Sequence, residues 1–130
     1  MKYMMAIALL MMTATLAAQQ TPSEAAPTYD VSKEIVVKGV VQATSEYRCP
    51  VTGAVGAHMD VLSDAETLQV HISSVKFMRE NEIAFKQGDE VRMLGNRVVF
   101  AGKPAFLPRT ITVGRTTYIF RTPAGMLVWW

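Results

Sequence analysis

The chain has 130 residues, a length that favours a single domain. Half of its residues are hydrophobic and 18% are charged, which excludes a disordered or low-complexity protein. Its single cysteine excludes a disulfide framework and a zinc site built only from cysteines. The formal net charge of +2 is too small to indicate a class of partner.

The N-terminus has the features of a secretory signal peptide. Lys2 is the only charge among the first 23 residues, an apolar run covers Met4–Met12, and the small residues Thr15 and Ala17 suit a cleavage site. The alternative is a membrane anchor, but the apolar stretch of about 15 residues is shorter than the span of about 20 that a bilayer requires. We therefore expect cleavage after residue 18, a periplasmic or secreted protein, and no stable membrane span in the mature chain.

Residues 19–32 are expected to form a flexible leader, and residues 33–130 the folded domain. The leader prediction rests on the segment QQTPSEAAPT, which is polar, contains two prolines and shows no periodicity. The stretch Glu34–Ala43 is rich in Val and Ile and predicts a strand. Gly39 lies in its middle, where a glycine often marks a bulge or a bend.

An antiparallel hairpin is predicted next, from Ala57–Leu62 and Thr67–Ile72. The side chains alternate. The apolar face would hold Met59, Val61, Leu68, Val70 and Ile72, and the polar face would hold His58, Asp60, Thr67, Gln69 and His71.

The second half of the chain predicts one short helix followed by strands. Ser73-Ser74 can cap a helix over Val75–Glu80 that ends at Asn81. The further strands would be Asp89–Leu94 and Arg97–Phe100 around a turn at Gly95-Asn96, then Ala105–Val113 interrupted by Pro108, and Thr116–Arg121. One helix after the third strand of a small all-β domain is the plan of the OB-fold, a five-stranded β-barrel.

Several segments carry a resemblance to a known group of proteins. They are Cys49-Pro50-Val51-Thr52-Gly53, Val70-His71-Ile72, Phe77, the run from Gly88 to Val98, the run from Phe120 to Gly125, and Trp129. From Glu34 onward the chain resembles small secreted bacterial OB-fold-like domain proteins of unknown function. The resemblance implies the fold and a location in the cell envelope, and it brings no catalytic residues. Trp130 extends past the single tryptophan near which such chains often end.

The two histidines are candidate metal ligands. In a hairpin closed by Asp64-Ala65, His58 faces His71, with Cβ atoms about 4.5–5.5 Å apart. Two imidazoles at that distance can share a divalent metal such as zinc or copper, with Cys49 on the preceding loop as a third ligand. The alternative is that both are ordinary residues of the polar outer face. Cys49 could also be buried and inert, or bridge two chains.

A basic and aromatic surface is the second candidate site. Residues 19–91 carry 6 basic and 11 acidic residues, net −5, whereas residues 92–130 carry 6 basic residues and no acid. The candidate ligand-binding residues are Arg92, Arg97, Lys103, Arg109, Arg115, Arg121 and Tyr118. OB-folds bind oligosaccharides and oligonucleotides, and outside the cytoplasm we expect an anionic envelope ligand, or a protein partner, rather than nucleic acid. The alternative is that the aromatic residues are core and the arginines pair with the acidic half.

The sequence lacks a nucleophile with its base, paired catalytic carboxylates and a cofactor-binding loop. We therefore expect a non-enzymatic binding or interaction module without a cofactor. The alternative function is a small periplasmic metal-binding protein that uses His58 and His71.

Overall fold

The computed structural model describes residues 27–48 and 54–129. The elements are a 3-10 turn η1 (Val31–Lys33), the strands β1 (Ile35–Arg48), β2 (Val55–Ser63) and β3 (Glu66–Ser74), the helix α1 (Val75–Glu80), and the strands β4 (Glu90–Phe100), β5 (Lys103–Val113) and β6 (Thr116–Ile119). The expected signal peptide, residues 1–18, lies outside the described residues. Within them, no helix combines the length and the apolar character needed to cross a membrane.

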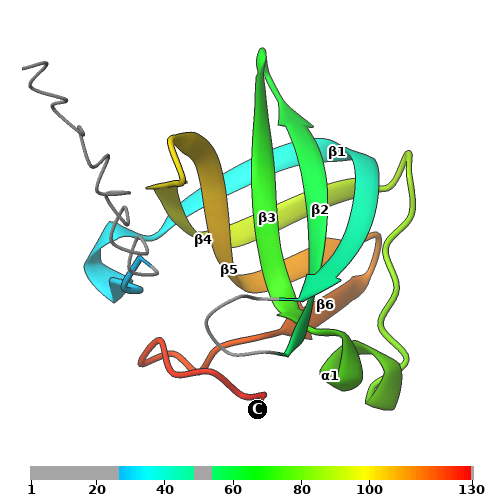
Figure 1. The fold of residues 1–130 in the computed structure, drawn as a ribbon. Coiled ribbons are helices and arrows are strands. Elements are labelled where there is room, and N and C mark those ends of the chain that lie inside the picture. Colours follow the sequence, from blue (N-terminus) through cyan, green and yellow to red (C-terminus); the bar gives the residue numbers. More distant parts are fainter. Residues whose placement is uncertain (1–26, 49–53, 130) are drawn as a thin grey trace, which may run out of the picture.

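The strands form one sheet in the order β3-β2-β1-β4-β5-β6. Neighbours in this order are antiparallel, and a short parallel pairing of β3 with β5 closes a ring of hydrogen bonds through five strands. Strand β6 extends the sheet from β5. Figure 1 shows α1 at one end of this ring, directly after β3. The prediction of a mostly β domain with one short helix after the third strand is confirmed.

Strand β1 is longer than predicted and changes partner along its length. Residues 35–40 pair with β4, and residues 40–48 pair with β2. The bulge on β1 lies between Val41 and Ala43, a short distance after Gly39. A Cβ atom at Gly39 would come within 2.5 Å of the Leu62 carbonyl oxygen, so glycine permits a close approach of the β1 and β2 backbones here.

The core lies on the inner faces of these strands. The apolar face of the predicted hairpin is buried throughout, because its side chains alternate with outward-facing ones. The largest fully buried side chains are Phe106, Phe120, Met59, Leu68, Met93 and Ile111. Trp129 is half-buried and packs against the same cluster.

The predicted turn at Gly95-Asn96 is wrong, because β4 runs through it without a break. A register shift between Leu94 and Gly95 accommodates the glycine within the ladder to β5. A Cβ at Gly95 would collide with the Leu107 carbonyl oxygen, which explains a glycine in mid-strand. Strand β5 likewise continues through Pro108, which lies opposite Gly95 at this irregularity.

The helix prediction is confirmed at both ends. The Ser74 hydroxyl accepts a hydrogen bond from the Phe77 backbone N–H at 3.2 Å, as an N-cap does. The helix covers Val75–Glu80 and Asn81 is its C-cap. Its buried residues, Val75 and Met78, belong to the core.

Part of the segment that we assigned to the leader contacts the sheet. Asp30 and Asn96 are joined by two hydrogen bonds, and Asn96 is buried. The Arg121 guanidinium lies over the Tyr29 ring, 4.4 Å from its centroid. The folded part of the chain therefore includes residues 29–33.

Candidate functional site

The predicted register of the β2–β3 hairpin is confirmed. His58 pairs with His71, and Ser63 pairs with Glu66 at the turn. The two imidazole rings meet edge to face, with centroids 4.8 Å apart and an interplanar angle of 85°. The structure thus brings together the two histidines on the outer face of the hairpin.

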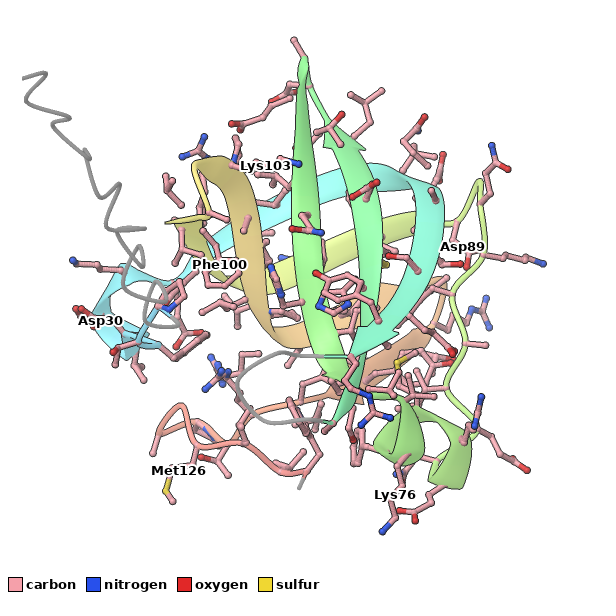
Figure 2. All side chains as sticks on the ribbon, viewed as in Figure 1. Asp30, Lys76, Asp89, Phe100, Lys103 and Met126 are labelled. Atoms are coloured by element: carbon pink, nitrogen blue, oxygen red, sulfur yellow. The ribbon has the colours of Figure 1, made fainter. Side chains whose placement is uncertain are left out.

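Two further rings flank this histidine pair. Tyr47 on β1 stacks on His58 at a centroid distance of 3.8 Å and an angle of 7°. Phe100, at the end of β4, meets His71 at 5.4 Å. The four side chains come from four strands, and we call them the aromatic row. Figure 2 shows Phe100 near the β4–β5 turn, from where it reaches β3.

The aromatic row shields the histidines from water although they face outward. His58 is only 7% exposed. Its burial lowers its pKa from 6.5 to about 4, and repulsion from His71 adds to this effect. Burial also lowers the pKa of His71. Both imidazoles are therefore neutral at pH 7, the state in which histidine binds a metal.

The hydrogen bonds of the pair are incomplete. His58 Nδ1 lies 3.1 Å from the Gly56 carbonyl oxygen, which can only accept, so Nδ1 carries the proton and Nε2 keeps its lone pair. His71 Nε2 is buried and has no hydrogen-bond partner among the described residues. The pair thus offers one free lone pair and one unsatisfied nitrogen.

The described residues supply no third metal ligand beside the two histidines. Cys49, the predicted third ligand, lies outside the described residues. In the part of the chain that the structure describes, no group of three or more His, Cys, Asp or Glu side chains could hold a metal ion.

Three of the predicted ligand-binding arginines contact other groups of the chain. Arg97 forms an ion pair with Glu66, and Arg109 forms one with Glu34 at 2.7 Å. Arg121 covers Tyr29 and donates a hydrogen bond to the Gly125 carbonyl oxygen.

Three aromatic side chains in the basic second half of the chain belong to the core or its edge. Tyr118 packs against the core beside Phe85. Phe106 and Phe120 are fully buried. These positions fit the alternative interpretation, in which the arginines pair with the acidic half of the chain and the aromatic residues belong to the core.

Arg92, Lys103 and Arg115 are exposed and form no ion pair among the described residues. Arg92 lies directly opposite Lys38 on β1, a pairing of like charges. On its other side Arg92 faces Thr112, which faces Thr117 on β6. The two threonine hydroxyls lie 2.8 Å apart. We call Lys38, Arg92, Thr112 and Thr117 the cationic row.

The cationic row borders a surface hollow of about 560 Å³. Lys38, Arg92 and Thr112 line it, and so do the glycines Gly39 and Gly114, which contribute no side chains. Glu90 also lines the hollow, which leaves a surplus of one positive charge there. Lys38 was not among the site residues predicted from the sequence. It lies next to Arg92 only because β1 pairs with β4, and the two residues are more than 50 positions apart in the chain.

No protein-family model matches the chain, and no curated protein matches it either.

Proposed function

We propose that this chain is a secreted, periplasmic, non-enzymatic binding module of the OB type, and that it binds an anionic ligand on the cationic row. The OB assignment is supported by the ring of five strands and by the helix between β3 and β4, which is the plan of that barrel. The periplasmic location is supported by the signal-like sequence of residues 1–18.

The observation that carries the anion proposal is the pairing of Lys38 with Arg92. Like charges directly opposite each other in a sheet destabilise it. Neither side chain has an ion-pair partner among the described residues, so an anionic group from outside would relieve the repulsion. Thr112 also lines the hollow, and its hydroxyl can donate a hydrogen bond to the same anion when Thr117 is the donor in the bond between the two threonines.

The neighbouring row of the same face is more apolar. It contains Val36, Leu94, Thr110 and Ile119, paired in that order across β1, β4, β5 and β6. Val36 and Ile119 are 49% and 56% exposed. The face therefore also suits a ligand in which an anionic group is attached to an apolar part, such as a lipid with an anionic head group.

The test measures binding of two probes by calorimetry, dextran sulfate and a soluble short-chain phosphatidylglycerol. The double variant Lys38→Gln/Arg92→Gln should bind whichever probe the wild type binds at least about tenfold more weakly. Binding by the wild type should weaken as the salt concentration rises from about 50 to 200 mM, because salt screens an electrostatic site. Lys86→Gln/Lys103→Gln removes the same charge from exposed positions outside the hollow and should bind as wild type. Equal binding by both double variants, or no binding of either probe, would refute the proposal.

A further inference from the structure

We propose that His58 and His71 bind one divalent metal ion of the zinc or copper class, each through its Nε2 atom. This site is independent of the anion site proposed above. It uses the outer face of β2 and β3, whereas the cationic row lies on β1, β4, β5 and β6.

The separation of the two rings fits a shared ion. A ligating nitrogen lies about 1.1 Å from the centroid of its imidazole, and the bond from zinc to nitrogen is about 2.0–2.1 Å, so each centroid would lie about 3.1 Å from the ion. The observed centroid distance is 4.8 Å. This distance is shorter than the separation of about 6.2 Å between two rings on opposite sides of one ion, so the rings are close enough to bind the same ion.

The hydrogen bonds match those of a metal-binding histidine. The Nδ1–H of His58 donates to the Gly56 carbonyl oxygen, which fixes the tautomer and leaves Nε2 free to bind a metal. The buried Nε2 of His71 has no hydrogen-bond partner among the described residues. Buried polar atoms are normally satisfied, and a metal ion would satisfy this one.

The surroundings hold the imidazoles in place. Tyr47 stacks on one face of His58, and its hydroxyl accepts a hydrogen bond from Gln69 at 3.3 Å. Phe100 packs against His71. At Gly56, an added Cβ would come within 2.9 Å of the His58 Cε1 atom, so the imidazole occupies space that only glycine leaves open. These contacts restrict both rings before any ion binds.

The described residues supply two ligands, so water would complete the coordination shell. A site with open positions exchanges its ion, in contrast to a closed structural zinc site with four protein ligands. This inference therefore concerns reversible binding rather than a metal required for folding.

The first experiment uses the wild-type protein and needs no substitution. The chain contains 2 histidines, so its proton NMR spectrum has only two sets of imidazole C–H signals. Titration with zinc(II) at pH 7.5 should shift both sets together, with saturation at one ion per chain. If neither set responds, or if only one does, the shared site is refuted.

The second experiment compares variants by calorimetry with zinc(II). His58→Gln and His71→Gln should each weaken binding at least about tenfold, and the double variant should not bind. Gly56→Ala, which leaves both ligands intact but displaces the His58 ring, should also weaken binding. Lys38→Gln/Arg92→Gln should bind zinc as wild type does, because failure of the anion site leaves this one intact. Wild-type affinity in the double histidine variant would overturn the proposal.

Discussion

Asn96 and Asp30 exchange two hydrogen bonds although they are 66 positions apart in the chain. The Asp30 N–H donates to Asn96 Oδ1 at 2.7 Å, and Asn96 Nδ2 donates to the Asp30 carbonyl oxygen at 2.9 Å. The amide side chain thus pairs with the backbone as a neighbouring strand would. It attaches the segment before β1 to the middle of β4.

Replacement of Asn96 by alanine should lower the free energy of unfolding by about 1–3 kcal/mol, because two backbone polar groups of Asp30 lose their partner. Chemical denaturation measures this change. Asn81→Ala is the matched control, since its amide donates a single bond to Phe77 from an exposed position. If Asn96→Ala lowers the free energy of unfolding no more than Asn81→Ala does, the attachment of Asp30 to Asn96 does not stabilise the fold.

Substitution by alanine and by asparagine distinguishes two reasons for glycine, namely close backbone packing at Gly95 and a positive φ at Gly102. At Gly95 an added Cβ meets the backbone of Leu107 and Pro108, so Gly95→Ala should cost about 1–3 kcal/mol and Gly95→Asn should cost more. Gly102 has a φ of +73° and open space around it, so Gly102→Asn should be better tolerated than Gly102→Ala. Thermal denaturation gives both rankings, and the same order at the two positions would contradict this explanation.

Stability should fall in acid through the histidine pair. The unfolded chain binds a proton at His58 near pH 6.5, whereas in the folded protein the pKa of His58 is about 4. Above pH 6.5 His58 is neutral in both states, so the free energy of unfolding has its full value. It falls as the pH decreases towards 4, by up to about 3 kcal/mol from this residue, because the unfolded chain binds the proton more readily. The pKa of His71 is shifted in the same direction. Other ionisable side chains also lie near His58. Tyr47 stacks on its ring, and Glu46 and Arg79 form an ion pair with each other at 3.9 Å.

Urea unfolding of the metal-free protein between pH 7.5 and pH 4 measures this loss. His58→Phe keeps a ring for Tyr47 to stack on and cannot titrate, so its stability should depend less on pH over the same interval. If the variant has the same acid sensitivity as wild type, burial of His58 is not the cause.

The cationic row should reduce stability in the absence of a ligand. Lys38→Gln removes one of two opposed like charges, and it should raise the free energy of unfolding slightly, by less than about 1 kcal/mol, at low salt. The gain should vanish at high salt because the repulsion is then screened. Lys86→Gln, an exposed lysine outside the hollow, should show no such gain. A loss of stability in Lys38→Gln at low salt would mean that Lys38 has a structural role instead.

The parts of this structure that could be predicted from the sequence are the local ones. The turn between β2 and β3 is short, so its position fixes the register and hence the contact of His58 with His71. The helix and its cap were predictable because Ser74 and Asn81 are adjacent to it in the chain.

The parts that escaped prediction depend on distant pairings. Tyr47 and Phe100 join the histidines from other strands, and Lys38 meets Arg92 only through the register of β1 with β4. Gly95 indicated a turn, because a close backbone approach inside a ladder leaves the same glycine signal in the sequence as a turn does.

The proposed anion site is tested most directly by nitrogen-15 NMR of the wild-type protein titrated with whichever of the two anionic probes binds. The amide signals of Lys38, Arg92, Thr112 and Gly114 should shift progressively, and the signals of Lys103, at the end of the molecule opposite α1 in Figure 2, should not. Shifts confined to the β4–β5 turn or to the outer face of β2 and β3, with none around Arg92, would contradict the assignment of the cationic row as the binding surface.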